Sequence, residues 1–454
     1  MSRFAAVASS LFAVAAGCGD DGGFVPPDAP PTIDDAPMVD ARPSGPVTVT
    51  TKVRCCTLTP GTVQAGVTVA VVQPDGTLGE TGVSDAAGQV SFTNVQLGAS
   101  ITAIYPEDAD ANTDISTIVG VKPGDSLTFG ENYYQPQPAG QGSKSSVTVT
   151  WPDTYNYYQV WAGACGSWGT YGGTAAFERK PGCDSATTPV VVVARDNNWD
   201  YVATAYLPAA DFTGSTVNVE SWTPNRTDFA VSISGVEAPM EVDFESVAAY
   251  PHAHVGIYNS GAEPTNGTVS ANLTVSATAV ATKTFAYLWR GQLEGRQEVY
   301  SGGVSPLALT APTLPWLSAA IVNIKTGKAG WFQTDGNADG AVFYLNWQHY
   351  DEGADLWRDY EWNLVLPPGL TELELESPVT ALAALLPDLV DDVDSPEVRL
   401  VDLSSTADYD AFRQLPEWRM TDVAASVIAG DEASASQSIS ADGGEGAALR
   451  RVGP

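Results

Sequence analysis

Hydrophobic and polar residues alternate along most of the chain from Val47 onward, with the period of two that a half-buried β-strand produces. Residues 89–93 are the clearest case, because Val90 and Phe92 fall on one face of the predicted strand and polar residues fall on the other. Turn residues of the Gly, Pro and Asp type separate these short runs, as at residues 74–76. The pattern therefore predicts an all-β protein of tandem antiparallel β-sandwiches.

The strand pattern falls into three β-rich stretches. A Gln-, Pro- and Gly-rich linker at residues 135–143 separates the first from the second, and helical periodicity is confined to residues 382–386 and 409–413. We expect a first sandwich at 47–134, a second sandwich at 145–235, a third β-rich module with short helices at 236–430, and a disordered tail at 431–454.

The first 17 residues have the layout of an export signal. Arg3 gives a basic start, residues 4–14 are apolar, and small residues precede Cys18. This layout resembles a bacterial lipoprotein signal, which implies cleavage before Cys18 and attachment of lipid to that cysteine. A plain secretory signal that happens to precede a cysteine is the alternative interpretation. Residues 18–46 are rich in Asp, Ala, Pro and Gly and cannot bury enough apolar surface to fold, so we expect a disordered acidic tether.

The first predicted sandwich carries a longer pattern of strands and turns. Between positions 60 and 130 it includes Gly66, Val67, Val69, Pro74, Asp75, Gly76, Asp85, Gly88, Val90, Phe92 and Ile101. This pattern resembles the carboxypeptidase regulatory-like domains, which are transthyretin-like sandwiches of bacterial surface proteins. The resemblance implies a spacer or interaction module without catalytic residues of its own. We expect all the modules to be of this transthyretin-like or immunoglobulin-like type.

The charge of the chain is strongly negative, with 54 Asp and Glu against 21 Lys and Arg and a formal net charge of −33. Binding to a nucleic-acid backbone depends on Lys and Arg that neutralise phosphates, so the composition argues against nucleic acid as a partner. The same field favours divalent cations or basic partners. No later stretch has 18 consecutive apolar residues, so we expect the lipid to be the attachment to an outer membrane or cell surface.

The cysteines other than Cys18 are even in number, which suits disulfides in an exported chain. Cys165 and Cys183 lie in one predicted module and form the expected disulfide. Cys55 and Cys56 are adjacent, and they could form a vicinal bridge, take separate partners or stay as buried thiols. The sequence does not choose among these three states.

One short motif has the spacing of a metal site. Asp335, Asn337 and Asp339, followed by Gly340, match the start of an EF-hand calcium loop, in which alternate oxygen-bearing side chains point inward. The twelfth position is Asn346 rather than a bidentate Glu. The interpretations are a calcium loop between two strands or an ordinary β-turn, for which these residue types are also favoured. No other cofactor is expected.

Signatures of common enzyme classes are missing from the sequence. It has no zinc-protease helix motif, no nucleophile elbow of the Gly-x-Ser-x-Gly type, and only three histidines to act as bases. We predict no catalytic residues. A polysaccharide hydrolase with paired carboxylates stays open, because the spacing that identifies such a pair is spatial.

Aromatic residues gather in the second module and in a hairpin predicted from residues 341–347 and 357–364 across a turn at 351–355. Most are expected to pack in cores or across strands, and Trp168, in a Gly-rich loop, is the expected exposed one. Exposed flat rings bind proteins or sugars. We therefore predict a surface-anchored, non-catalytic adhesion, scaffold or binding protein with an unidentified protein or glycan partner. A carbohydrate-binding protein is the alternative.

Overall fold

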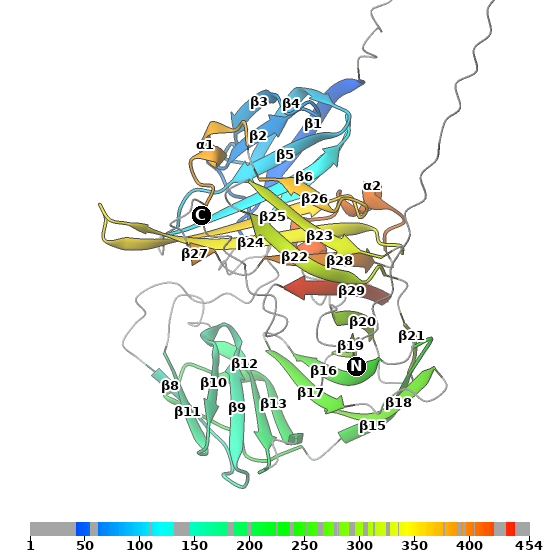
Figure 1. Cartoon of the computed structure of the whole chain (residues 1–454). Coiled ribbons are helices and arrows are strands. Elements are labelled where there is room, and N and C mark those ends of the chain that lie inside the picture. The colour runs from blue at the N-terminus through cyan, green and yellow to red at the C-terminus, as the bar shows by residue number, and fades with distance from the viewer. Residues whose placement is uncertain are drawn as a thin grey trace, which may run out of the picture. The chain divides into compact units, whose positions relative to one another are not determined.

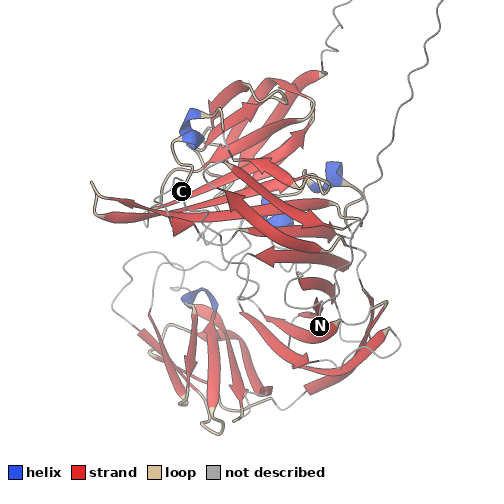
Figure 2. Ribbon diagram, in the orientation of Figure 1, coloured by secondary structure: helices blue, strands red, loops and turns tan. Residues whose placement is uncertain are grey.

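The protein is described by a computed structural model in which strands dominate and helices are few and short (Figures 1 and 2). The structure describes residues 42–54, 62–108, 111–130, 146–178, 186–197, 201–223, 226–236, 240–250, 253–260, 267–276, 279, 281–289, 296–302, 307–311, 314–323, 327–334, 336–375, 377–387, 392–393, 396–403, 405–421 and 433–440. The predicted all-β class and its multiple sheets are confirmed. Within these residues no helix is long and apolar enough to cross a membrane.

The first sandwich packs a three-stranded sheet on a four-stranded one. The order β4-β1-β7 joins β1 (Ser44–Thr51), β4 (Gln89–Gln96) and β7 (Ser126–Phe129), and the order β3-β2-β5-β6 joins β2 (Thr68–Val72), β3 (Leu78–Val83), β5 (Ala99–Ile104) and β6 (Asn112–Val121). Both sheets contribute to one core, in which Val47 and Phe92 meet Val69 and Ile101. The alternation at Val90 and Phe92 therefore marks a real strand, β4.

The second sandwich has the same two-layer plan. Its larger sheet has the order β10-β9-β12-β13, from β9 (Tyr157–Ala162), β10 (Ser167–Thr170), β12 (Thr187–Arg195) and β13 (Tyr201–Asp211). The other sheet has the order β11-β8-β14, from β8 (Ser146–Thr150), β11 (Thr174–Glu178) and β14 (Thr216–Asn218). A short 3-10 helix, η1 (Gly163–Cys165), connects β9 to β10.

The next strand, β15 (Arg226–Ser234), falls inside the expected second sandwich, which was predicted to end at residue 235. It pairs instead with strands that come later in the chain. It lies between β18 (Thr268–Ser276) and β21 (Leu307–Thr310). Phe229, Val231 and Ile233 of β15 enter a core with β16 (Glu241–Tyr250) and β19 (Ala281–Trp289). This burial explains the shift of the boundary to about residue 225. The remaining strands of this part are β17 (Ala253–Ser260) and β20 (Arg296–Gly302).

The rest of the chain forms a further β-rich part with three short helices. Its strands are β22 (Leu317–Asn323), β23 (Lys328–Gln333), β24 (Gly340–Asp351), β25 (Leu356–Leu366), β26 (Glu372–Glu374), β27 (Asp392–Val393), β28 (Glu397–Leu403) and β29 (Ala433–Ser440). Its helices are α1 (Thr380–Ala383), α2 (Tyr409–Phe412) and α3 (Glu417–Thr421). The predicted hairpin is present as β24 and β25, which pair from Ala341 and Leu366 to Asp351 and Leu356.

Two pairings depart from the expected modular plan. β25 pairs in parallel with β6, so the sheet of the first sandwich continues into β24, β25 and β28. β29 pairs with both β20 and β28, although its residues fall in the tail that was expected to be disordered. The expected module at 47–134 is therefore joined to a later part of the chain by a shared sheet.

Candidate functional site

Trp168 lies on β10, the edge strand of the larger sheet of the second sandwich. Among the strands that the structure describes, β10 pairs only with β9, and Trp168 stands opposite Val160. Val160 is fully buried, whereas Trp168 is 58% exposed because the sheet ends beside it. The predicted exposure of Trp168 is confirmed.

The connection before Trp168 is tight and covalently fixed. The Ala162 N–H donates to the carbonyl of Gly166 at 3.0 Å, which closes the turn from β9 to β10. A side chain on Gly163 would meet the Thr188 methyl at 2.7 Å, so glycine is needed there. Cys165 is disulfide-bonded and nearly buried. Its expected partner, Cys183, lies outside the described residues, so the pairing with Cys183 stays a prediction.

A second aromatic pair covers the other face of β10. Tyr157 and Tyr171 meet edge to face, with ring centroids 5.2 Å apart, and Tyr171 is 72% exposed. The hydroxyl of Tyr157 lies so close over Gly169 that any side chain there would clash. Strand alternation puts Trp168 on the opposite face from Gly169. The edge of this sheet thus has aromatic rings on both of its faces, with Tyr157 coming from β9 and Tyr171 from just beyond β10.

The end of the β24–β25 hairpin presents a further aromatic pair. Tyr350 and Trp357 are cross-strand partners with centroids 5.1 Å apart, and they are 40% and 54% exposed. Figure 1 shows this end of the hairpin extending past the neighbouring strands. The sequence predicted the hairpin but did not select these two rings. The signal available was their position next to the turn.

The turn of the hairpin is built by carboxylates. Asp351 accepts hydrogen bonds from the backbone N–H of Gly353 at 2.9 Å and of Ala354 at 3.1 Å, and Asp355 adopts a left-handed conformation with φ of 53°. Asp tolerates that conformation because its short side chain bonds locally. Arg358 also donates hydrogen bonds to Asp351. The hydrogen bonds from Arg358, and with them those from the backbone N–H groups of the turn, lower the pKa of Asp351.

Most other aromatic residues of the two predicted clusters are core residues, as expected. Trp331, Trp347 and Trp362 are nearly or fully buried in one core, and Trp151 and Tyr158 are buried in the second sandwich. Stacking across strands holds several of them, as for Trp347 on Tyr360 at 5.2 Å. Exposure is therefore the property that sets Trp168, Tyr171, Tyr350 and Trp357 apart.

The candidate calcium loop is only partly described. Asn337 is exposed and Asp339 is buried, and Asp335 lies outside the described residues. Asp339 Oδ2 accepts hydrogen bonds from the Leu403 N–H at 2.9 Å and from the Thr406 hydroxyl, which ties the loop to β28. The described part of the chain holds no group of three or more His, Cys, Asp or Glu residues arranged for a metal. Calcium binding at this loop stays a prediction.

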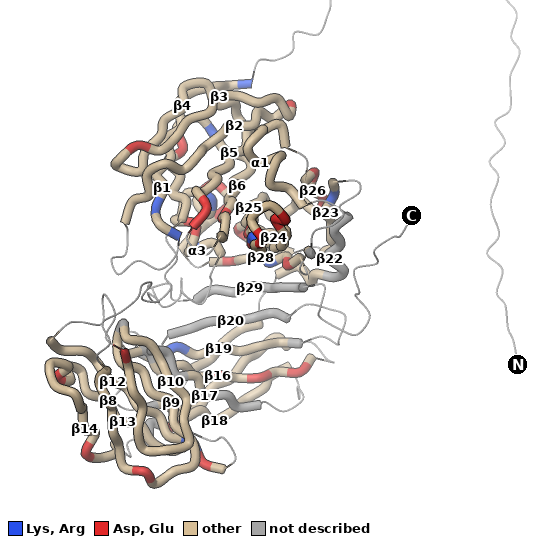
Figure 3. Tube along the Cα trace, turned by 90° about the vertical axis from the view of Figure 1, so that its left-hand side faces the viewer, with Lys and Arg blue, Asp and Glu red and all other residues tan. Residues whose placement is uncertain are grey.

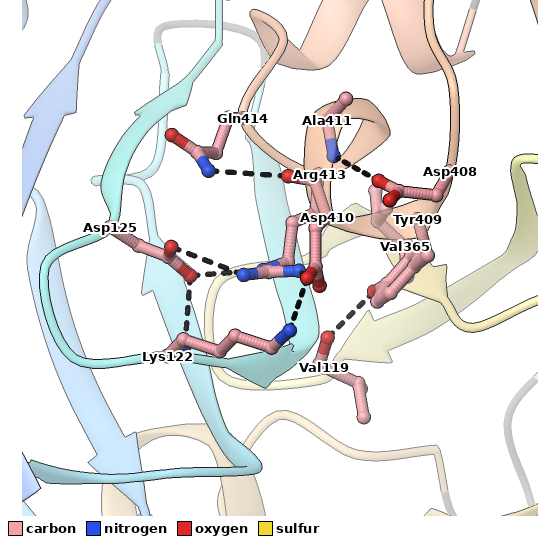
Figure 4. A network of polar contacts seen from close by, with 10 residues as sticks. All are labelled: Val119, Lys122, Asp125, Val365, Asp408, Tyr409, Asp410, Ala411, Arg413 and Gln414. Atoms are coloured by element: carbon pink, nitrogen blue, oxygen red, sulfur yellow. Dashed lines mark hydrogen bonds and ion pairs between the residues drawn. The ribbon is translucent and has the colours of Figure 1, made fainter.

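A buried ion pair joins α2 to the first sandwich (Figure 4). Arg413 donates to Asp125 at 2.9 and 3.1 Å, and both side chains are almost fully buried. Asp410 contacts both Arg413 and Lys122, and the hydrogen bond from Lys122 is the main cause of the lowered pKa of Asp410. The Tyr409 hydroxyl donates to the Val119 carbonyl at 2.6 Å. These groups hold structure together.

A second buried acid, Glu417 of α3, anchors the same junction. It accepts hydrogen bonds from Arg54 at 2.9 Å, from the Ser116 hydroxyl at 2.6 Å and from the Gly130 N–H at 2.7 Å. No signal in the sequence could have joined Arg54 to Glu417, because 363 positions separate them.

Cys18, where lipid attachment is predicted, and the adjacent Cys55 and Cys56 lie outside the described residues. Their predicted roles stay predictions.

Comparison with known proteins does not assign a family or a role to this site. No family model and no curated protein matches the chain. Among solved structures, the TIE protein of Bacillus anthracis is 10% identical over 59% of this chain with a TM-score of 0.14, and the match spans about half of that protein (49%). The fimbrial anchor protein Mfa2 of Porphyromonas gingivalis is 12% identical over 54% of this chain and 77% of its own, with a TM-score of 0.11.

A third structure, the pilus adhesin SpaC of Lactobacillus rhamnosus GG, is 11% identical over 72% of this chain and 44% of its own, with a TM-score of 0.13. At such TM-scores these likenesses carry no argument about function. The function has to be argued from the chain itself.

Proposed function

We propose that this chain is an exported, lipid-anchored, non-catalytic binding protein of a bacterial surface. The support for export and anchoring is the signal-like N-terminus and Cys18 followed by an acidic, Pro-rich segment. The carboxypeptidase regulatory-like resemblance of the first sandwich supports a spacer or interaction role for that part. In this proposal the sandwiches present binding surfaces at a distance from the membrane.

The observation that carries the binding role is the aromatic edge of the second sandwich. A folded protein normally buries most of the surface of rings as large as those of Trp168 and Tyr171, yet both side chains are more than half exposed. Trp and Tyr are enriched among residues that dominate binding energy, because a rigid ring buries much area at little entropic cost. The disulfide at Cys165 and the short turn before β10 hold Trp168 in place before a partner arrives. Such pre-organisation favours affinity.

Carbohydrate binding is the second candidate for the same edge. Flat aromatic faces with an apolar body stack on sugar rings. The sheet edge offers Trp168 of β10 on one face and, on the other, Tyr157 of β9 with Tyr171, which directly follows β10. A protein partner would use the same rings as anchors. Only binding data separate these two candidates.

The test is a glycan array and a surface-protein capture assay with the full chain and its Trp168→Ala variant. We expect loss of the bound partner in Trp168→Ala and retention in Phe332→Ala, which removes an equally exposed ring, 67% exposed, on β23. Unchanged binding by Trp168→Ala would remove the aromatic edge from the proposal. Turnover of peptidoglycan or polysaccharide by the full chain would contradict the non-catalytic role.

The anchor is tested by Cys18→Ser. We expect this variant to leave the membrane fraction and to keep the circular-dichroism spectrum of a folded β protein. A Cys18→Ser protein that stays with the membrane would overturn the lipid anchor.

A further inference from the structure

One face of the hairpin continues from the exposed aromatic pair into a row of acids. Residues paired across a sheet share a face, and so do residues two positions apart along one strand. Tyr350 and Trp357 therefore lie on the same side as the pairs two and four positions further from the turn. That side carries Gln348 with Asp359 and Asn346 with Glu361. The parallel neighbour β6 adds Asp114 beside Glu361. We call Tyr350, Trp357, Asp359, Glu361 and Asp114 the acidic face.

The acidic face is open to solvent at its outer end. The side chains of Glu361 and Asp114 are 48% and 30% exposed, and Gln348 and Asn346 are exposed. The face becomes buried toward Asn363, the residue after Trp362 on β25. A partner could therefore contact the aromatic pair and the acids together.

Several polar atoms at the inner end of this face lack a hydrogen-bond partner within the part of the chain that the structure describes. Asn363 is 2% exposed, and its side-chain oxygen is buried without a donor, although its NH2 group donates to Glu361 at 2.8 Å. One carboxylate oxygen of Asp359 is likewise buried without a donor. Tyr105, directly after β5, is 6% exposed, and its backbone N–H donates to the Asp114 carbonyl. Its hydroxyl and Arg54 Nη1 are also buried without a hydrogen-bond partner among the described residues. Buried acceptors without donors are costly, so they favour a ligand that brings N–H groups.

The charge of this region is unbalanced. Arg54 faces Glu417 at 2.9 Å, Glu361 at 3.6 Å and Asp114 at 3.9 Å. Arg399 lies over the Tyr344 ring on the same side of the sheet, but it pairs with Glu397. Burial is the main cause of the raised pKa of Asp114, the charges of Glu361 and Glu417 add to it, and Arg54 opposes it. Figure 3 marks the acidic and basic positions along the described elements. One guanidinium does not neutralise three carboxylates.

We propose that the acidic face binds a basic segment of a partner polypeptide, in which Lys or Arg side chains pair with Glu361, Asp114 and Asp359 while Trp357 and Tyr350 pack on their stems. Exposed aromatic rings attract such cations through the ring face as well as through apolar contact. A neutral sugar could stack on the rings but would leave the carboxylates unpaired. This inference rests on the proposed binding role, and it names a second surface and the chemistry of its partner.

The test is fluorescence anisotropy with a labelled octapeptide of alternating Lys and Ser, titrated with the full chain. Because the chain carries a net charge of −33, any basic peptide feels an overall attraction. The informative quantity is therefore the difference in peptide affinity between matched variants of the chain. We expect Trp357→Ala to weaken binding about tenfold or more, as for a central anchor, and Trp357→Phe to keep part of the affinity.

The charge arm compares Glu361→Gln with Glu220→Gln, which removes an exposed acid of the second sandwich. Glu361→Gln should weaken binding severalfold and reduce its dependence on salt, and Glu220→Gln should leave both nearly unchanged. Equal effects of the two Gln variants, or wild-type binding by Trp357→Ala, would overturn the proposal. Displacement of the peptide by a neutral cello-oligosaccharide would do so as well, by assigning the face to glycans. Partner loss in Trp168→Ala with no peptide binding would leave the proposed function standing and remove only this site.

Discussion

Two arginines hold the helical segment α2–α3 against the first sandwich, and they do so in nearly the same way. Arg413 lies 5.8 Å from the ring centre of Tyr409, and Arg54 lies 5.7 Å from that of Tyr105. Each guanidinium also contacts a buried carboxylate at 2.9 Å, Asp125 in one case and Glu417 in the other. The two clusters differ in how completely their charges and hydrogen bonds are matched.

Around Arg413 the charges balance, because Arg413 and Lys122 face Asp125 and Asp410. The hydroxyl of Tyr409 also has its acceptor, the Val119 carbonyl. Around Arg54 one base faces three acids, and within the described residues the hydroxyl of Tyr105 has no hydrogen-bond partner. Buried groups that are fully paired serve the fold, whereas unmatched ones close to the surface have interactions left to make. The comparison therefore separates a structural cluster from a candidate binding surface.

The largest effect is expected from breaking the balanced cluster. Arg413→Leu leaves Asp125 buried without its partner, and removal of one member of a buried pair costs about 3–5 kcal/mol. Urea denaturation of the full chain should show this loss in the transition that includes the first sandwich. The control is Arg358→Leu, whose side chain is 24% exposed and pairs with surface acids, so its loss of stability should be much smaller than that of Arg413→Leu. Equal losses in the two variants would contradict the structural role of the Arg413 cluster.

The hairpin and its turn illustrate what the sequence could predict. The alternation at residues 341–347 and 357–364 and the Asp- and Gly-rich turn between them are local signals, and the strands and the turn form where they were expected. The exposure of Trp168 was also predicted from its Gly-rich surroundings, but the loop expected there is wrong, because residues 167–170 form the edge strand β10.

The acidic face could not be predicted in the same way. Strand alternation assigns Asp359 and Glu361 to one face but does not say which strand lies beside them, and β6 is more than 240 positions earlier in the chain. The contact of Arg54 with Glu417 and the pairing of β29 with β20 and β28 also join distant segments. Which rings stay exposed depends on where those neighbours end. Tertiary pairing, and not local pattern, decided this part of the candidate site.

An intermediate effect on the free energy of unfolding is expected when the pH is lowered. Its sign should be opposite for Asp410 of the Arg413 cluster and Asp114 of the Arg54 cluster. Hydrogen bonds from Lys122 and Arg413 lower the pKa of Asp410. Its contribution to stability is therefore present above the unfolded-state value of about 3.9 and is lost as pH falls through the folded-state value. Burial and neighbouring acids raise the pKa of Asp114. Its contribution is therefore full below about pH 3.9 and is lost as pH rises through the folded-state value.

Urea midpoints measured across this acid range would show the difference. Asp410→Asn should be less stable than the parent at neutral pH and should converge with it in acid. Asp114→Asn should be as stable as the parent or more stable at neutral pH, because it removes a carboxylate whose ionised form the fold disfavours, and its advantage should vanish in acid. If Asp114→Asn proved less stable than the parent at neutral pH, the carboxylate would be a matched group and the two clusters would not differ.

The smallest effect on stability is expected from Glu361→Gln, and this variant sharpens the comparison most. Its side chain is half exposed and lies 3.6 Å from Arg54, so the ion pair is worth about 0–1 kcal/mol. The amide oxygen of Gln can still accept the hydrogen bond from Asn363, and Arg54 keeps Glu417 at 2.9 Å. The urea midpoint should therefore hardly move, while the affinity for the basic peptide falls. If the loss of this carboxylate weakens binding and leaves stability unchanged, its role is to contact a partner. A large loss of stability would instead make Glu361 a structural acid like Asp125.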